Sequence, residues 1–371
     1  GVNVRSIWRR VNEFGIDSRQ RYSDITDEEL DDTVAEIKSS LPEAAGTGTV
    51  LGYLTARNIH IANGHRRVYE SLARLDQLAT TRRWNPPLTR RTYWVPGPGS
   101  LWHLDGNHKL IRWRIVIHGS IDGYSRLITM LHASDNNFAS TVGLLFTEAV
   151  REFGMPSRPR TDRGGENEVA GAIMESVRGL GRGSWLRGPS VHNQRIERLW
   201  RDLRCFCTNF YIDLFYQLEE MGVLTVDSNV HMFSLHYVFI PRLNSALRDF
   251  QQSYNNHRIR TMNNRTPVQM YFSGLMTRYN SNYLHVREAI DNATPDIDFT
   301  EYAVEGRTAG ASDNETLVYV PRPSLGIDNE QYNILMLKLS ELVPNVNVQC
   351  QDNGIKMYLS VLMHTNDFIN M

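Results

Sequence analysis

The sequence has 371 residues, with 41% hydrophobic and 22% charged residues, which are the proportions of a folded globular protein. This length suggests two or three domains, and the composition excludes a disordered chain. The net charge of −1 hides a segregation, since residues 51–98 contain about eight basic and two acidic residues, whereas residues 286–371 contain about five and thirteen. We expect a nucleic-acid contact in the basic part and another role for the acidic part.

The chain has three cysteines, which cannot form a disulfide framework and include no CxxC pair for zinc. This usage fits a reducing, intracellular compartment. No apolar run approaches the roughly 18 residues of a membrane span, and no signal peptide is visible. The chain starts at Gly1 inside a helical pattern, so we expect the native protein to extend upstream.

Residues 1–80 show apolar residues at helical spacing and are expected to form a DNA-binding region. The spacing predicts helices at about 1–16, 26–40, 46–59 and 65–76. The tight turn before the last helix, which carries Arg66 and Arg67, is typical of a helix-turn-helix. The alternative is a small helical bundle with a solvated basic face. Residues 81–100, rich in Arg, Pro and Gly, are interpreted as a basic linker.

Residues 101–280 change to a pattern of strands followed by alternating helices and strands, which predicts a mixed α/β sheet. We expect strands at about 101–110, 113–121, 126–133, 158–162 and 183–188, and helices at about 137–154, 165–179, 193–220 and 241–256. Residues 290–371 are acidic and are expected to form a small α+β domain of unknown role. In it, a helix near 329–342 precedes a hairpin that turns at Asp352-Asn353-Gly354.

Three acidic residues stand out by their context. Asp105 lies in the middle of a strand, Asp162 ends a strand before a Gly-Gly turn, and Glu197 lies on a helix beside its apolar stripe. Three carboxylates that converge repel one another unless cations lie between them, and oxygen ligands favour Mg²⁺ or Mn²⁺. The alternative is structural, with the aspartates capping turns and Glu197 pairing with Arg201 on the next helical turn.

The residues around these acids are rich in arginine and are candidates to bind DNA phosphates. On the helix they are Asn193, Arg195, Arg198 and Arg201, and in the Gly-Gly turn Arg163. The nearby His103, His108 and His192 are adequately explained as polar positions near a cleft.

The stretch from about 100 to 275 resembles the catalytic core of retroviral integrases and related DDE transposases. The motifs, in order, are "WHLDGNHK", "IDGYSRLI", "RTDRGGEN", "GPSVHNQRIERLWRDLR" and "YNNHRIRTMNNRTPVQMY". Asp162 and Glu197 are 35 positions apart (197 − 162), which is close to the family's D,D-35-E spacing. The resemblance implies a ribonuclease H-like catalytic core, a mixed five-stranded sheet flanked by helices. It also implies that Asp105, Asp162 and Glu197 are the catalytic, metal-binding acids.

The resemblance further implies a DNA strand-transferase that uses two Mg²⁺ or Mn²⁺ ions. Such an enzyme would act in the nucleus as a homo-oligomer on element ends and target DNA. The alternatives are a domesticated DNA-binding protein that keeps the fold without transposition, and a hydrolytic nuclease. The chain departs from the retroviral pattern because it has no N-terminal His-His-Cys-Cys zinc module, and its C-terminal part is acidic.

Overall fold

A computed structural model describes residues 22–41, 45–75, 93–162, 164–188, 193–291 and 318–370. The helix predicted at 1–16, most of the basic linker, Arg163 and His192 lie outside these ranges. No helix of the described part is long and apolar enough to cross a membrane.

The centre of the molecule is a mixed five-stranded sheet with the strand order β3-β2-β1-β4-β5. The strands are β1 (Trp102–Asn107), β2 (Val116–Asp122), β3 (Ile128–Ser134), β4 (Pro159–Thr161) and β5 (Leu186–Arg187). The first three are antiparallel, and β4 and β5 run parallel to β1. The predicted mixed sheet is therefore confirmed, and β1 is its central strand.

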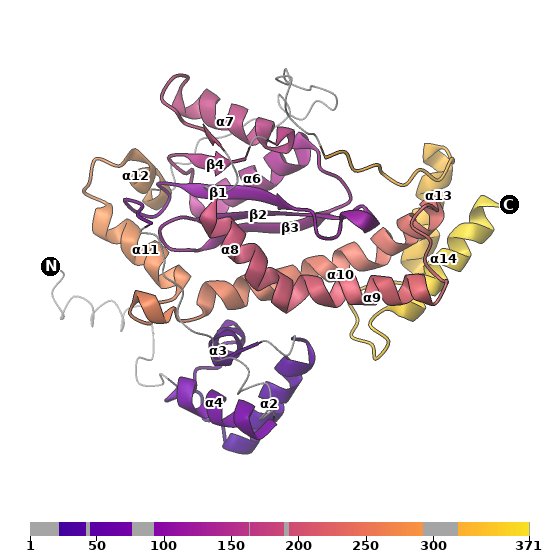
Figure 1. Cartoon of the computed structure of the whole chain (residues 1–371), viewed down its shortest axis with the longest axis horizontal. Helices are drawn as coiled ribbons and strands as arrows, with labels where there is room; N and C mark the ends of the chain where they lie inside the picture. The colour runs from indigo at the N-terminus through magenta and orange to yellow at the C-terminus, as the bar shows by residue number, and fades with distance from the viewer. Residues whose placement is uncertain are drawn as a thin grey trace.

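Two helices, α6 (Ala139–Phe153) and α7 (Glu168–Arg178), cover one face of the sheet (Figure 1). Trp102 and Leu104 of β1 point to this face and pack in one apolar cluster with Phe146 of α6. Because side chains alternate along a strand, the neighbouring His103 and Asp105 point to the opposite face.

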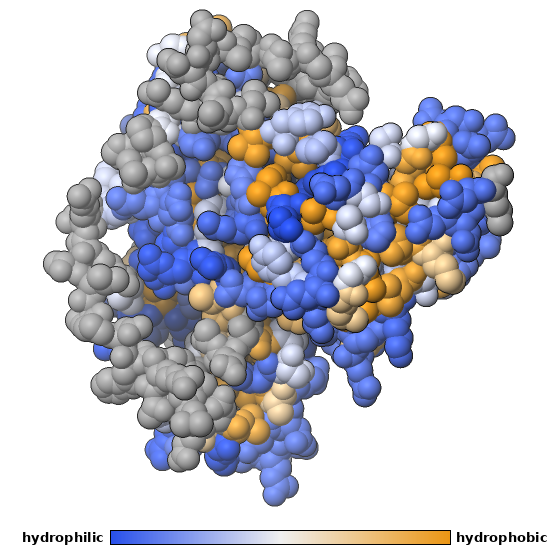
Figure 2. All heavy atoms as spheres, turned by 45° about the vertical axis from the view of Figure 1, so that its right-hand side comes forward, coloured by the Kyte–Doolittle hydropathy of each residue, from blue (hydrophilic) through white to orange (hydrophobic). Residues whose placement is uncertain are grey.

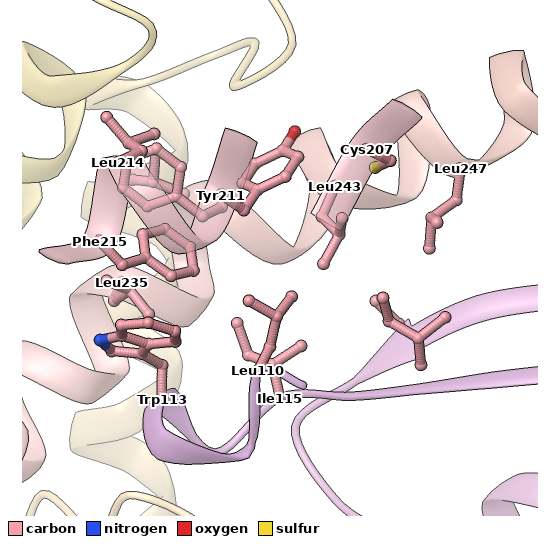
Figure 3. Close-up of a cluster of buried hydrophobic side chains, with 14 of the residues drawn as sticks. Leu110, Trp113, Ile115, Cys207, Tyr211, Leu214, Phe215, Leu235, Leu243 and Leu247 are labelled. Atoms are coloured by element: carbon pink, nitrogen blue, oxygen red, sulfur yellow. The ribbon is translucent and has the colours of Figure 1, made fainter. Parts of the chain in front are cut away.

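The opposite face is covered by α8 (Gln194–Leu203), a π turn (Arg204–Thr208), α9 (Asn209–Glu220) and α10 (Asn229–Asn256). Their apolar side chains pack against Leu110, Trp113 and Ile115 beside the sheet (Figure 3). The aromatic density after Phe206, which could have been a base-stacking platform, is largely core, with Tyr211 and Phe215 buried.

Helix α10 is longer than the sequence predicted, because it begins at Asn229 and not near residue 241. Ser228 caps its start by accepting a hydrogen bond from the backbone N–H of His231. Pro241 lies inside the helix, where it cannot donate to the carbonyl of the residue four positions earlier. The predicted start is therefore wrong, and Pro241, a residue type common in the first turn of a helix, here lies in the interior of one.

Side chains of α10 bond the outward-facing backbone groups of β3, which is an edge strand of the sheet. The amide of Asn244 bonds both backbone groups of Ala133, and the amide of Asn255 bonds both backbone groups of Ile128, at 2.8–3.0 Å. The distance along α10 from Asn244 to Asn255 and the distance along β3 from Ile128 to Ala133 are both about 16 Å. Both asparagines can therefore reach the strand at the same time. The edge is thereby closed to pairing with another strand.

The N-terminal helices α2 (Asp27–Ser39), α3 (Thr47–Ala56) and α4 (Gly64–Leu75) have an apolar cluster of their own. Helix α2 begins with a reciprocal capping box between Thr26 and Glu29. Helix α3 lies against α10, where Ser253 donates to the carbonyl of Thr49, and these helices sit below the sheet in Figure 1.

Helices α11 (Pro267–Arg278) and α12 (Leu284–Ile290) follow α10, and α13 (Asn329–Leu342) and α14 (Ile355–Ile369) pack beside α9 and α10 (Figure 1). The described residues also include short 3₁₀ turns at Ile111–Trp113, Gly165–Asn167 and Arg260–Met262.

The C-terminal hairpin predicted around residues 352–354 is wrong. Gly354, in a left-handed conformation with φ of 95°, precedes α14, and the buried Tyr358, Val361 and Thr365 follow at helical spacing. The described part of this region contains helices and no strand. Its outer side exposes Leu337 and Met363 among other apolar residues, and Figure 2 shows an apolar area on this side of the molecule.

Candidate active site

Asp105 lies in the middle of the central strand β1, opposite Gly119 of β2. The missing side chain of Gly119 leaves room for the indole of Trp200, since a Cβ there would lie 2.4 Å from the ring. Trp200 Nε1 donates a hydrogen bond to Asp105 Oδ2 at 2.7 Å. The strand register and one glycine therefore bring helix α8 onto the central acid.

Asp162 follows β4, which pairs in parallel with β1, so it ends the strand next to that of Asp105. Its Oδ1 accepts hydrogen bonds from the backbone N–H of Gly164 at 3.0 Å and from Asn167 Nδ2 at 3.4 Å. These contacts give Asp162 the turn-capping role that was the structural alternative, and they also fix its position.

Glu197 lies on α8, three residues before Trp200, and is exposed. It forms no ion pair with another described residue, and in particular none with Arg201. The salt-bridge interpretation of this glutamate is therefore not borne out within the described chain.

Burial raises the pKa of Asp105 to about 7, and the negative charges of Asp162, Glu197 and Glu166 act in the same direction. The hydrogen bond from Trp200 opposes these effects. The three predicted acids therefore share one electrostatic neighbourhood around Asp105. Each added negative charge at such a site favours protonation unless a cation compensates it.

Glu166 is a fourth acid at this site that the sequence did not reveal. It is buried, and its Oε1 accepts a hydrogen bond from Asn167 Nδ2 at 2.9 Å, the amide that also reaches Asp162. Burial raises its pKa, and the charge of Asp162 adds to the effect. In "RGGEN" this glutamate reads only as part of a glycine-rich turn, so its burial had no sequence signal.

No three His, Cys, Asp or Glu side chains of the described ranges are arranged to hold a metal ion. The available donors are nevertheless carboxylate oxygens, which suit Mg²⁺ or Mn²⁺. One oxygen of Asp105 is occupied by Trp200. Metal binding by Asp105, Asp162 and Glu197 would therefore require their side chains to move closer together.

A line of buried hydrogen bonds connects β1 with the start of α8. Asn193 Nδ2 donates to the carbonyl of Leu104 at 2.9 Å, so Asn193 Oδ1 is the atom that accepts from His103 Nδ1. His103 Nε2 then accepts from the hydroxyl of Tyr93 at 2.6 Å. Burial lowers the pKa of His103 to about 4, which keeps the ring neutral.

This line changes the interpretation of Asn193 and His103. Asn193 was predicted to contact DNA, but it is only 2% exposed and both the nitrogen and the oxygen of its amide are hydrogen-bonded within the protein. Its observed contacts hold the first turn of α8 against β1. His103 has the structural role that its sequence position favoured.

The predicted DNA-binding arginines of α8 differ in their contacts. Arg195 donates to the carbonyl of Gly123 and lies 4.2 Å from the ring centre of Tyr93, so it contributes to the packing of α8. Arg198 is exposed and forms an ion pair with Asp202 at 3.1 Å. Arg201 is exposed and forms no ion pair with another described residue. Of the three, Arg201 has the fewest competing contacts.

The arginines of α4 are paired with acids. Arg67 bonds Asp27 at 2.6 Å, Arg74 bonds Asp31 at 2.7 Å, and the exposed Arg66 bonds Glu70 on its own helix at 2.7 Å. Arg67 and Arg74 thereby hold α4 against α2. DNA contact by Arg66 and Arg67 stays a prediction, and it would compete with these pairs.

Central carboxylates on a mixed sheet, with a third acid on a helix packed across it, define the class of the polynucleotidyl transferases. The family model described as integrase core domain matches residues 92–284, which is just over half of the chain. The chain therefore belongs to the integrase core domain family, and its core has the ribonuclease H-like fold. No curated protein matches it.

Solved structures similar to the chain include retroviral integrases. The trimeric form of the HTLV-2 integrase catalytic core domain in complex with magnesium is 14% identical with a TM-score of 0.29, covering 47% of this chain and 97% of that one. A simian T-cell lymphotropic virus intasome in complex with PP2A regulatory subunit B56 gamma is 16% identical with a TM-score of 0.36, covering 75% and 78%. These likenesses are too distant to carry an argument about activity.

Proposed function

We propose that this chain is a divalent-metal-dependent DNA strand-transferase. Water would hydrolyse a phosphodiester at an element end, with the water oxygen bonding to phosphorus and the P–O3′ bond breaking. The freed 3′-hydroxyl would then attack a target phosphodiester and displace its 3′ oxygen. The observation that supports this most is the shared charge environment of Asp105, Asp162 and Glu197, together with membership of the integrase core family.

We propose that these three acids would hold two Mg²⁺ or Mn²⁺ ions. Bound ions would polarise the phosphodiester and lower the pKa of the attacking hydroxyl or water. The chain's own part is to position the acids, Asp105 through Trp200, Asp162 through Gly164 and Asn167, and Glu197 through the anchoring of α8. The HTLV-2 integrase core is a complex with magnesium, which is a fact about that protein.

The proposed partners are element-end DNA, target DNA and further copies of this chain, with the nucleus as the compartment. An oligomer is consistent with the similar structures, which include a trimeric form, a dimeric form and an intasome.

The test compares the full chain with Asp162→Asn in an assay with duplex DNA of the element ends and Mg²⁺. Asparagine has the same shape and still offers an oxygen to the N–H of Gly164. Asp213→Asn, on the exposed face of α9, is the matched control. We expect joined and nicked products from the wild type and the control, and none from Asp162→Asn.

The products also separate the alternatives. Nicked but never joined DNA would indicate a hydrolytic nuclease. Equal activity of the wild type and Asp162→Asn would refute the proposed triad. Tight DNA binding by all three proteins without any product would favour a domesticated DNA-binding protein.

A further inference from the structure

The segment from Phe250 to Arg287 contains no acidic residue in a chain whose net charge is −1. Three of its five arginines, Arg258, Arg260 and Arg265, lie in the loop between α10 and α11, which we define as residues 257–266 (the α10–α11 loop). All three are exposed. By sequence alone, this stretch is only the segment that closes the core.

These arginines differ from the basic residues of α4 in having no acidic partner in the part of the chain that the structure describes. None of the three forms an ion pair with another described residue. In α4, by contrast, Arg66, Arg67 and Arg74 all contact carboxylates. Packing therefore does not explain the three loop arginines.

The backbone of the α10–α11 loop is closed by its own hydrogen bonds. The N–H of Ile259 donates to the carbonyl of Arg265 at 3.0 Å, and the N–H of Asn264 donates to the carbonyl of Ile259 at 3.1 Å. Asn263 and Asn264 both adopt the left-handed conformation that such a tight loop needs, with φ of 56°. The three guanidinium groups are thus carried on an ordered backbone, which reduces the entropy lost on binding.

The loop lies beside the C-terminal half of α8. A groove there is lined by Asp202 and Phe206 from α8 and the π turn, by Tyr254 from α10, and by His257, the first residue of the loop. His257 directly precedes Arg258, and Asp202 is the partner of Arg198. The first residue of the loop and the C-terminal end of α8 therefore line one groove.

The same groove reaches the N-terminal helices. Thr49 of α3 lines it, and the carbonyl of Thr49 accepts a hydrogen bond from Ser253 of α10. The α10–α11 loop is thus close both to the helix that carries Glu197 and to the helices expected to bind DNA.

We infer that the α10–α11 loop binds the phosphate backbone of double-stranded DNA through Arg258, Arg260 and Arg265. Guanidinium groups suit phosphate because they donate paired hydrogen bonds and stay charged. Between Arg258 and Thr266 there is no aromatic residue to stack on bases, and the ring of His257 packs against Tyr254 and bonds its carbonyl, so the loop favours duplex backbone over single strands. The inference deepens the proposed function, since it names where the DNA of that reaction would be held.

The test measures the affinity of the full chain for a random-sequence duplex by fluorescence anisotropy at several salt concentrations, without divalent cations. The test variant is Arg258→Ala/Arg260→Ala/Arg265→Ala. The slope of log K against log salt is negative, and each lost phosphate contact makes it less steep by about 0.9. The loss of three contacts therefore predicts a slope that is less steep by about 2.7. We expect a loss of affinity of at least about tenfold at low salt.

Two further variants serve as controls, one for the number of charges removed and one for the charge at the loop positions. Arg151→Ala/Arg158→Ala/Arg287→Ala removes three exposed charges at other places and should leave the slope nearly unchanged. Lysine at all three loop positions should keep most of the slope, because the charge remains. A slope in the test variant equal to that of the wild type, or equal losses in the test and control variants, would overturn the inference. Loss of binding to a single strand but not to duplex would overturn it as well.

The outcome is independent of catalysis. The same titration with Asp162→Asn should give the wild-type slope, whether or not the wild type joins DNA. A changed slope in the loop variant together with an inactive wild type would leave the loop site standing and remove the strand-transferase proposal. An active wild type with an unchanged slope in the loop variant would support the strand-transferase proposal and remove the loop site. Binding of an acidic protein but not of duplex DNA would assign the loop to a protein partner and contradict the inference.

Discussion

Trp200 Nε1 lies 2.7 Å from Asp105 Oδ2, so a residue on the next turn of α8 after Glu197 holds the carboxylate at the centre of the sheet. The contact links two of the three predicted acids mechanically, since any shift of α8 moves both Glu197 and the donor to Asp105. Its hydrogen bond also lowers the pKa of Asp105, against the effect of burial and of the neighbouring acids.

Replacing Trp200 by phenylalanine should raise the pKa of Asp105 above its value of about 7, because the hydrogen bond that favours the ionised form is lost. A carbon-detected NMR titration of the aspartate carboxyl groups, with Asp105→Asn for assignment, measures this directly. A hydrogen bond to a charged group contributes about 1.5–3 kcal/mol, so an unchanged titration would mean that the contact is absent in solution.

Gly119 should not tolerate alanine, because the added Cβ would lie 2.4 Å from the indole of Trp200. Overpacking of this kind costs about 1–3 kcal/mol in the free energy of unfolding, which urea denaturation measures. Gly48→Ala on α3 is the control, since no atom lies within 4 Å of the place that its new methyl group would occupy, and alanine favours helix. Equal stability of the two variants would show that Trp200 does not lie over Gly119.

Sequence reasoning located the sheet and the three acids because both depend on local signals. Alternating apolar residues mark β1 around Asp105, and the spacing between Asp162 and Glu197 is independent of the packing. Trp200 over Gly119 could not be foreseen, since that contact depends on how β1 and β2 pair. The role of Asn193 was missed for a related reason, because a polar residue before a basic helix gives no sign that it will be buried.

The same limit explains the errors in the helices. The sequence predicted a helix only from about residue 241, although the apolar residues on both sides of Pro241 belong to one continuous helix that packs along β3. In the C-terminal region, Asn353-Gly354 favours a hairpin locally, yet the left-handed glycine precedes a helix whose buried face packs on α10. In both places tertiary packing decides between two locally acceptable structures.

Replacing Asn244 by alanine should destabilise the protein by about 2–4 kcal/mol, because it leaves the N–H and the carbonyl of Ala133 without partners. Asn256→Ala is the control. It removes an exposed hydrogen bond from Asn256 Nδ2 to the carbonyl of Gln252 on the same helix, and should change the free energy of unfolding by no more than about 0.5 kcal/mol. Urea denaturation compares the two. Similar stabilities would argue that water replaces the amide at the edge of β3.

Stability should depend on pH through Asp122, whose carboxylate is fully buried in the turn between β2 and β3. Burial raises its pKa from 3.8 to about 6, so the folded protein binds this proton more tightly than the unfolded chain. The contribution is therefore fully present below about pH 3.8, falls as the pH rises through about 6, and then stays constant.

Asp122→Asn isolates this effect, because the amide does not titrate. As the pH rises from about 4 to about 6, the free energy of unfolding of the wild type should decrease relative to that of the variant. The two free energies are measured by urea denaturation at each pH. A difference that is independent of pH over this interval would show that Asp122 is ionised in the folded protein throughout.

Replacing Tyr93 by phenylalanine should loosen the start of α8 while leaving most of the fold unchanged. The hydroxyl is the donor to His103 Nε2, and His103 in turn bonds Asn193, so its loss leaves a buried ring nitrogen unpaired. Hydrogen exchange should become faster at the backbone N–H groups of Ile196 and Glu197, which both bond the carbonyl of Asn193. Tyr216→Phe, on the half-exposed face of α9, should leave these two groups unchanged; equal exchange in the two variants would mean that the line of hydrogen bonds does not anchor the helix that carries Glu197.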